Sequence, residues 1–507
     1  MLLSELLTST TPLALGGSVA LEIQGLYYDS RQVKPGGLFF ALKGVASDGH
    51  RFIDKALSAG AVAVVLEDET CAPATATWVK VADARLAMTR MAAHFYGNPA
   101  DSIPLVGITG TNGKTTTTYL VEAILAGGGM PAAVLGTISY RFRDRVIPAP
   151  NTTPESVDLQ RILREVVDMG AASVVMEVSS HALEQRRVDG GRFDVGVFTN
   201  LTRDHLDYHH DMESYLASKQ RLFSELLTPD RVKPQRRAVI NFDDGYGSQV
   251  AAITACPVIG YGLGAGVQVT ARDYSFTVDG ISGTLVTPAG EISFRSALLG
   301  RFNLYNILAA VGTGIALGIP LNAIRDGIER HTSVPGRLER VANKRGVALL
   351  VDYAHTGDAL ENVLRTLKEL AEGRIITVFG CGGDRDRGKR PVMGEIAARY
   401  SDLAIVTSDN PRTEDPAAIL AEVRGGISPL GLREYAPGDL VEGIGEKGFC
   451  TIENRREAIR LAVRLARPRD IVLLAGKGHE DYQIIGTEKH HFDDREEAAY
   501  AFAEMES

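Results

Sequence analysis

The chain has little cysteine, and its cysteines are scattered. Only four occur among 507 residues, at Cys71, Cys256, Cys381 and Cys450. No two of them form a C-x-x-C pair, which argues against a disulfide scaffold and against a structural zinc site. We expect the protein to work in a reducing compartment, the cytoplasm.

The sequence also lacks a basic region, a basic N-terminal start and a clean apolar span. Its net charge is -9, which argues against nucleic acid as a partner because phosphate contacts require a basic face. The first Lys or Arg is Arg31, so we expect no secretory signal. The most apolar stretch, residues 297–319, is interrupted by Arg301, Asn303 and Asn306, which excludes a simple membrane span.

The length and the hydrophobic pattern predict several α/β domains. A chain of 507 residues corresponds to three or four domains of about 150 residues each. Short apolar runs alternate with amphipathic stretches, which is typical of α/β domains with largely parallel sheets. Pro/Gly-containing passages at residues 96–104 and 332–341 predict boundaries that give domains 1–98, 99–335 and 336–507.

The segment "GITGTNGKTTTTYL" (residues 107–120) has the features of a phosphate-binding loop. A buried-strand pattern, "IPLVGIT", precedes it, and a helical pattern follows it, which is the context that such a loop requires. The common motif G-x-x-x-x-G-K-[ST] would place glycine where Ile108 stands, so the loop belongs to a different family from the common one. The predicted ATP-binding residues are Gly110, Thr111, Asn112, Gly113, Lys114, Thr115 and Thr116.

The chemistry of this loop suits a metal-bound triphosphate. Gly110 and Gly113 can take backbone angles that let amide groups converge on phosphate, and the helix N-terminus adds a partial positive charge. Lys114 can bind the β- and γ-phosphates, and the Thr115 hydroxyl can ligate Mg²⁺. The alternative is an ordinary strand-to-helix turn with a surface lysine.

Three further residues follow downstream at positions that suit a phosphoryl-transfer site. Glu177 ends a predicted strand, at the edge where open α/β sheets bind their ligands. His205 follows another predicted strand, and Lys219 lies on a predicted helix. A hydroxyl, a carboxylate and an imidazole can together hold divalent metals. The alternatives are a helix cap, a surface histidine and a solvated lysine.

Several motifs in order resemble the Mur ligases, which add amino acids to a UDP-linked peptidoglycan precursor. They are "GTNGKTT", "NTTP", "EVSSHAL", "NLTRDHLDYH", "Y-x-x-x-K-x-x-LF", "GRFNLYN", "PGRLE" and "DYAHT". The resemblance runs from about residue 28 to about residue 485 and is strongest with members that add the third residue. It implies a UDP-sugar-binding N-terminal domain, a central ATPase domain and a Rossmann-like C-terminal domain.

The resemblance also implies roles for nucleotide and metal contacts. Thr115 and Glu177 would hold one Mg²⁺, His205 would hold a second, and Lys219 would be carbamylated by CO₂. Lys114, Glu177, His205 and Lys219 would then be the catalytic residues. The remaining nucleotide contacts would come from Asn303, Asn306, Arg337, Asp352 and His355.

For the UDP-muramoyl-dipeptide, the resemblance implies two groups of contacts. Ser30, in "YYDSRQVKPGG", would meet the UDP moiety together with the backbone near Val45 to Ser47. The muramoyl-dipeptide would be held by Asn151, Thr152, Thr153, Ser179, Gln185 and Arg187.

The segment "VTSDNPRTEDP" (residues 406–416) bears on which amino acid is added. A guanidinium binds a carboxylate with two hydrogen bonds, and diaminopimelate has a second carboxylate that lysine lacks. Asp-Asn-Pro-Arg resembles the signature of meso-diaminopimelate-adding members, although a plain turn with a solvated arginine is the alternative. The implied contacts are Arg385, Asp409, Asn410, Pro411, Arg412, Gly476 and Glu480.

Together these features predict ATP-dependent amide formation through an acyl phosphate. Other functions left open are a lysine-adding or folylpolyglutamate-type ligase, an ATP-driven switch or binding module, and a sugar-nucleotide-binding protein with an inactive site. "GCGGDRDRGKRP" fails as a dinucleotide fingerprint because Arg385 occupies the last glycine position, so NAD is rejected. We expect a monomer.

Overall fold

The computed structural model describes residues 1–44 and 47–506, and its contacts divide the chain into two compact units. Val45 and Ala46, part of the expected UDP contact, lie outside the described residues. The first unit comprises Met1–Arg272, Leu285–Ile292 and Tyr305–Ile328. The second comprises Asp273–Thr284, Ser293–Leu304 and Glu329–Ser507.

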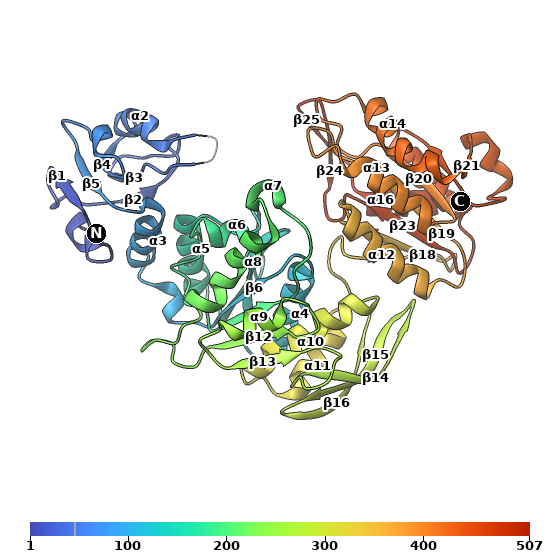
Figure 1. The fold of residues 1–507 in the computed structure, drawn as a ribbon, viewed down its shortest axis with the longest axis horizontal. Coiled ribbons are helices and arrows are strands. Elements are labelled where there is room, and N and C mark those ends of the chain that lie inside the picture. The colour runs from blue at the N-terminus through green and yellow to red at the C-terminus, as the bar shows by residue number, and fades with distance from the viewer. Residues whose placement is uncertain (45–46, 507) are drawn as a thin grey trace. The chain divides into compact units, whose positions relative to one another are not determined.

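The first unit begins with a five-stranded sheet in the order β1-β5-β4-β3-β2 (Figure 1). Only β1 is antiparallel to its neighbour. The strands are β1 (Ala14–Gly16), β2 (Gly25–Tyr27), β3 (Gly37–Phe40), β4 (Ala61–Leu66) and β5 (Thr77–Lys80), and the helices are α1 (Leu3–Leu7), α2 (Ile53–Ser58) and α3 (Ala84–Phe95).

An eight-stranded sheet follows, in the order β13-β12-β11-β6-β10-β7-β8-β9. It is parallel from β13 to β7, and β8 and β9 are added as an antiparallel extension. Its strands are β6 (Leu105–Thr109), β7 (Ala132–Leu135), β8 (Ser139–Phe142), β9 (Arg145–Pro148), β10 (Ser173–Glu177), β11 (Val195–Phe198), β12 (Arg237–Asn241) and β13 (Val258–Tyr261). Its helices are α4 (Lys114–Gly127), α5 (Ser156–Asp168), α6 (Ser180–Glu184), α7 (Leu206–His209), α8 (Met212–Arg221) and α9 (Gly247–Ala252), and a π-helical turn (Leu222–Leu226) follows α8.

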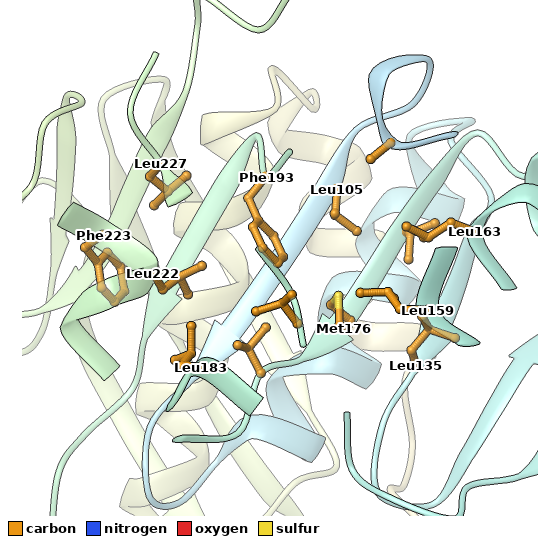
Figure 2. Close-up of a cluster of buried hydrophobic side chains, with 14 of the residues drawn as sticks. Leu105, Leu135, Leu159, Leu163, Met176, Leu183, Phe193, Leu222, Phe223 and Leu227 are labelled. Carbon is orange, nitrogen blue, oxygen red and sulfur yellow. The ribbon is translucent and has the colours of Figure 1, made fainter. Parts of the chain in front are cut away.

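The middle strands of this sheet are buried along their whole length because both faces of the sheet are covered. All five residues of β6 and all five of β10 are buried. Figure 2 shows one side of this core, where Leu159 and Leu163 of α5 and Leu222 and Phe223 after α8 meet the sheet. The strand expected within "IPLVGIT" is confirmed at Leu105–Thr109, and the helix expected after the loop is confirmed from Lys114.

The second unit contains a seven-stranded sheet in the order β17-β18-β23-β19-β20-β22-β21, in which only β17 is antiparallel. Its strands are β17 (Glu339–Val341), β18 (Ala348–Asp352), β19 (Ile375–Phe379), β20 (Leu403–Val406), β21 (Arg433–Glu434), β22 (Gly448–Thr451) and β23 (Ile471–Ala475). Its helices are α12 (Gly357–Leu370), α13 (Lys389–Tyr400), α14 (Pro416–Ile427), α15 (Arg455–Leu465) and α16 (Asp494–Glu506). A hairpin of β24 (Tyr482–Ile485) and β25 (Glu488–His491) follows β23.

The remaining elements are a small sheet and two helices. The sheet has the order β14-β15-β16 and consists of β14 (Thr270–Thr277), β15 (Gly280–Thr287) and β16 (Gly290–Ser296). The helices are α10 (Arg301–Ala316) and α11 (Leu321–Arg330). In the described part of the chain, no helix combines the length and the apolar character that crossing a membrane requires. The expected α/β fold with largely parallel sheets is confirmed.

Candidate functional site

Three neighbouring parallel strands, β11, β6 and β10, bring the predicted phosphate-site residues to one edge of the central sheet. The phosphate loop follows β6, Glu177 is the last residue of β10, and Thr199 and Asn200 follow β11. Carboxyl ends of parallel strands meet at the same edge, which is where open α/β sheets bind ligands. Segments far apart in sequence therefore form one site.

Asn200 fixes the phosphate loop from the neighbouring strand end. Its backbone oxygen accepts from the Thr111 amide at 2.9 Å, and its side-chain oxygen accepts from the Asn112 amide at 2.9 Å. The Thr199 hydroxyl donates to the Asn112 backbone oxygen at 2.6 Å. The amides of Thr111 and Asn112 thus hold the loop in its shape.

Two glycines allow this loop shape. Gly110 has φ +147° and Gly113 has φ +86°, in the range where side-chain-bearing residues are strained. A Cβ at Gly110 would lie 1.9 Å from the Thr199 hydroxyl oxygen, and one at Gly113 would lie 2.3 Å from Asn306 Oδ1. The predicted glycine positions are therefore required by both backbone angle and space.

Lys114 and Thr115 begin α4 and face the carboxylate that ends β10. The Lys114 ammonium donates to the backbone oxygens of Gly110 and Thr111, both at 2.8 Å. The Thr115 hydroxyl donates to Glu177 Oε2 at 3.1 Å, and both side chains are buried. Thr137 also binds Glu177, through its amide at 2.9 Å and its hydroxyl at 3.0 Å. Thr115 and Glu177 are thus brought together as predicted, and Thr137 was missed.

Lys219 is buried beside the same loop. Its ammonium donates to the Gly110 backbone oxygen at 3.0 Å and lies 4.5 Å from the centre of the Tyr215 ring. Burial lowers the pKa of Lys219 well below its usual range, and the nearby charge of Lys114 lowers it further. A lowered pKa favours the neutral, nucleophilic amine, which is the form that reacts with CO₂.

Tyr215 links Lys219 with His205 and the loop. The ring centres of Tyr215 and His205 are 6.1 Å apart, and the Tyr215 hydroxyl lies 3.1 Å from the Thr111 hydroxyl. His205 precedes α7 with φ +53°, its ring is 5.0 Å from that of His181, and its side chain is about half exposed, at 48%. Tyr215 was not predicted as a site residue, although its motif was recognised.

The residues expected to hold the muramoyl-dipeptide form a connected cluster next to Glu177. The Thr153 hydroxyl donates to the Glu177 backbone oxygen at 2.8 Å and accepts from the Ser179 amide at 3.0 Å. Arg187 donates to Gln185 Oε1 at 2.6 Å and to the Thr153 backbone oxygen at 3.2 Å. Two further hydrogen bonds belong to this cluster. The hydroxyls of Thr152 and Thr137 are 3.1 Å apart, and the Tyr140 hydroxyl donates to the Asn151 backbone oxygen.

Ser30 lies elsewhere, on the turn after β2 in the N-terminal sheet, where it is 7% exposed. Asn303 and Asn306 lie on one face of α10, and both are buried. Asn306 Oδ1 accepts from the Thr117 hydroxyl at 3.4 Å, which places it against the start of α4. The Asn303 amide donates to the Leu299 backbone oxygen at 2.9 Å.

In the second unit, Arg337, Asp352 and His355 lie around Tyr353. The Arg337 guanidinium is 5.0 Å from the Tyr353 ring centre, and the His355 ring is 4.6 Å from it. The Asp352 carboxylate accepts from the amides of Leu338 and Ala354, at 2.7 and 2.8 Å. Burial raises the pKa of Asp352, and Arg337 opposes that rise. The three predicted residues are therefore near one another at the end of β18.

A second group of predicted residues lies at the carboxyl ends of β20 and β23. The Asn410 amide donates to Glu480 Oε2 at 3.0 Å, and a Cβ at Gly476 would lie 3.9 Å from Asp409 Oδ2. Burial would raise the pKa of Asp409, but Lys477 and Arg455 hold it below its usual range. The predicted residues Asp409, Asn410, Gly476 and Glu480 are thus brought together.

Arg412 follows Pro411 in the same loop, and hydrogen bonds hold both its backbone and its side chain. Its Nη1 donates to the Gly383 backbone oxygen at 2.8 Å, and its amide donates to the Ile484 backbone oxygen at 3.1 Å. It has φ +53° and is half-buried, directly after the buried Pro411. Arg385, on the loop after β19, is exposed.

The sequence alone did not identify two buried basic residues next to Asp409, which are Lys477 and Arg455. Lys477 has no exposed surface and lies 3.3 Å from Asp409 Oδ1. Arg455 pairs with Asp494 at 2.6 Å, both fully buried, and donates to the Ala475 backbone oxygen at 3.0 Å. Lys477 stands between the predicted contacts Gly476 and Glu480 in the sequence, so its position was visible but its burial was not.

The residues present fit a magnesium nucleotide. Among residues 1–44 and 47–506, no group of three or more His, Cys, Asp or Glu converges as a metal site. Mg²⁺ in nucleotide sites typically uses one or two protein oxygens together with phosphate and water. The adjacent oxygens of Thr115 and Glu177, 3.1 Å apart, match that requirement.

A glycine-rich loop between a central parallel strand and a helix, with a buried carboxylate on the next strand, defines a phosphate-loop nucleotide-binding α/β protein. Comparison of the sequence with protein-family models identifies the family within this class. The Mur ligase family catalytic domain matches residues 22–96, the Mur ligase middle domain matches 108–314, and the Mur ligase glutamate ligase domain matches 336–478.

Individual relatives agree with these matches. A Geobacter metallireducens protein named UDP-N-acetylmuramoyl-L-alanyl-D-glutamate–2,6-diaminopimelate ligase is 69% identical over 507 residues, which cover 100% of this chain and 99% of the relative. A solved structure of a protein with the same name is 33% identical, has a TM-score of 0.71 and covers 100% of this chain and 99% of its own. The chain belongs to the Mur ligase family, as its motifs predicted.

The family fold extends to a more distant nucleotide-bound structure. The MurF ligase from Thermotoga maritima, solved in complex with ADP, is 19% identical with a TM-score of 0.62, and the match covers 96% of this chain and 98% of that one. At this identity the likeness shows the fold alone. Mur ligases are ATP-dependent enzymes, and the phosphate loop described above lies in the matched middle domain.

Proposed function

We propose that this protein is an ATP-dependent ligase that joins meso-diaminopimelate to the D-glutamyl carboxylate of UDP-N-acetylmuramoyl-L-alanyl-D-glutamate. The observation that carries the choice of amino acid is the pocket at Asp409–Arg412. It presents two carboxylates and an anchored guanidinium within one short segment and its contacts. The full-length relative at 69% identity is named for this reaction.

The proposed chemistry makes a poor acyl donor reactive. A glutamyl carboxylate oxygen attacks the γ-phosphorus of ATP, the bond to ADP breaks, and an acyl phosphate forms. The diaminopimelate amine attacks the acyl carbon and loses a proton, and the tetrahedral intermediate then expels inorganic phosphate as the amide forms. Lys114, at the start of α4, offsets the charge of the transferred phosphoryl group.

Metal and carbamate groups fit around the same loop. Thr115 and Glu177 would hold one Mg²⁺ and His205 a second, and the ions would supply positive charge next to the phosphates. Lys219, which is buried and has a lowered pKa, would add to CO₂ through its amine, lose a proton and become an anionic carbamate that could serve as a ligand of the second metal. Tyr215 and the Gly110 backbone oxygen position the Lys219 side chain.

The substrate contacts follow from the two pockets. Asn151, Thr152, Thr153, Ser179, Gln185 and Arg187 would hold the muramoyl-dipeptide, and Ser30 would contact the UDP group. Asn303, Asn306, Arg337, Asp352 and His355 would complete the ATP contacts. For diaminopimelate, Arg412 with Arg385 would bind the distal carboxylate, while Asp409, Asn410, Gly476 and Glu480 would bind the neighbouring ammonium.

We retain the predicted domain limits of 1–98, 99–335 and 336–507, a monomeric state and a cytoplasmic location. ATP and UDP-linked precursors are cytoplasmic metabolites of the proposed reaction. Gel filtration with light scattering tests the monomer, and a mass near 54.5 kDa is expected.

Oxygen labelling tests the reaction directly. The purified protein is given UDP-muramoyl-dipeptide with ¹⁸O in the D-glutamyl carboxylate, together with ATP and diaminopimelate. One labelled oxygen should appear in each phosphate released, and release should require both the dipeptide and the amino acid. Unlabelled phosphate would refute the acyl-phosphate route. Release that ignores either substrate would favour an ATP-driven switch, and lysine serving as well as diaminopimelate would favour a lysine-adding ligase.

A further inference from the structure

Lys477 is a fully buried cation that the proposed reaction has not yet used. It follows Gly476 at the carboxyl end of β23, and its side chain has no exposed surface. Removing an ammonium group from water costs several kcal/mol unless it is paired and hydrogen-bonded. The position of Lys477 therefore depends on the acceptors around its ammonium group.

The partners of Lys477 are the residues that would meet the substrate ammonium. Its Nζ lies 3.3 Å from Asp409 Oδ1, 3.4 Å from Asn410 Oδ1 and 3.6 Å from Glu480 Oε2. Asn410 in turn donates to Glu480. One ammonium therefore connects three residues that come from two separate loops.

We propose that Lys477 is a positioning and specificity-determining residue of the amino-acid pocket, holding Asp409 and Glu480 in place for one substrate ammonium and favouring their carboxylate forms. This inference rests on the proposed function. Two carboxylates and one lysine leave this part of the pocket with a net charge of -1, which a single ammonium neutralises. Arg412 and a substrate carboxylate form the second neutral pair.

This charge balance matches the zwitterionic end of a diamino diacid. Without Lys477, the buried carboxylate of Asp409 would face the partly buried carboxylate of Glu480 with no cation between them, which favours protonation of one of the two. The pocket would then lose an acceptor for the substrate ammonium. Burial and Asp409 already raise the pKa of Glu480, and Lys477 opposes that rise.

Several charged or titratable groups besides Lys477 face Asp409 and influence its titration. Arg455 at the start of α15 and His355 after β18 lower the pKa of Asp409. Glu480 is the neighbouring carboxylate, and Tyr353 and Cys381 are weaker acids whose pKa values Asp409 raises. Arg455 remains in place when Lys477 is replaced, so the effect of Lys477→Met measures the lysine alone.

The electrostatic part is tested without turnover. Aspartate carboxyl carbons are labelled with ¹³C in the full-length protein, the Asp409 signal is assigned with Asp409→Asn, and its titration is followed by NMR. Lys477→Met should raise the pKa of Asp409 by about one unit or more. Lys489→Met is the matched control, because Lys489 lies over the Tyr482 ring on the exposed strand β25. An unchanged Asp409 pKa in Lys477→Met would overturn the proposal.

The kinetic part separates positioning from support of the fold. Lys477→Met should raise the KM for diaminopimelate by about 10-fold or more and change the KM for ATP less than 2-fold. The acid limb of kcat/KM for diaminopimelate should move to higher pH, because a carboxylate with a raised pKa is protonated sooner as pH falls. A fall in kcat with an unchanged KM for diaminopimelate and an unmoved acid limb would refute the role.

Lys477→Arg keeps the test decisive if Lys477→Met does not fold. The arginine keeps the charge but changes the shape, so the KM for diaminopimelate should rise while the acid limb stays where it is in the parent protein. A moved acid limb in Lys477→Arg would contradict the proposal. Failure of the proposed function is recognised separately, because the unsubstituted protein would then release phosphate without diaminopimelate, whereas the NMR titration would still report on Lys477.

Discussion

Replacing Arg412 with lysine separates recognition of a carboxylate from recognition of an amine. The guanidinium of Arg412 is fixed by a 2.8 Å bond from Nη1 to the Gly383 backbone oxygen, and it remains half-buried. A lysine can keep one of the arginine's hydrogen bonds but has no second, parallel donor for a carboxylate. Since neither residue is glycine, the positive φ of +53° costs the same in both proteins.

The expected magnitude follows from the lost bond. One hydrogen bond to a charged group contributes about 1.5–3 kcal/mol, which corresponds to about 10- to 150-fold at about 1.4 kcal/mol per tenfold change. Arg412→Lys should therefore raise the KM for diaminopimelate within that range and leave the KM for ATP within 2-fold. Activity with lysine as acceptor should stay as low as in the parent protein, because lysine has no distal carboxylate to lose.

The assay is phosphate release at varied diaminopimelate with the other substrates saturating, repeated at varied ATP. Arg424→Lys is the matched control, since Arg424 is a surface residue paired with Glu434 at 2.7 Å. Equal rises in the two KM values would refute the assignment of Arg412. So would a loss of lysine-dependent activity that parallels the loss with diaminopimelate, because a general defect would then be sufficient.

Three further predictions concern the phosphate loop, the buried lysine and one ion pair. Gly113→Ala should raise the KM for ATP by about 10-fold or more, because its Cβ would lie 2.3 Å from Asn306 Oδ1, whereas Gly129→Ala, with φ +77° and open space, should not. Lys219→Met should lower kcat by about 100-fold or more and abolish a carbamate signal seen by ¹³C NMR with labelled bicarbonate; a retained signal would place the carbamate elsewhere. The hydrogen bond from Arg390 lowers the pKa of Glu414 to about 2, so its stabilisation is complete above the unfolded value of 4.5 and is lost as pH falls toward 2. Glu414→Gln should thus lower the Tm more at pH 7 than at pH 3.5, and an equal loss at both would contradict the linkage.

Local patterns in the sequence were sufficient for much of the fold and part of the site. The apolar run before Gly110 and the helix beginning at Lys114 could be predicted because strand and helix periods are local properties. Glu177 was placed correctly at the end of β10 for the same reason. Order of motifs along the chain was sufficient to recognise the family.

The contacts that Asn200 and Lys477 make with distant segments could not be predicted. Asn200 binds the amides of Thr111 and Asn112 only because β11 pairs with β6, and nothing local in the sequence specifies that pairing. In the sequence, Lys477 is indistinguishable from a solvent-exposed lysine. Only the order of the strands in the sheet shows that it contacts Asp409. A polar residue's burial is set by tertiary packing, which a single sequence does not show.

The fully buried pair of Arg455 and Asp494 has a consequence for how the protein is made. Arg455 reaches the Ala475 backbone oxygen beneath the amino-acid pocket, and Asp494 begins α16, the last helix described. An unpartnered charge at that depth costs about 3–5 kcal/mol. A nascent chain therefore cannot complete this ion pair until the segment carrying Asp494 has left the ribosome, and a chain truncated just before Asp494 would leave the buried charge of Arg455 without that carboxylate.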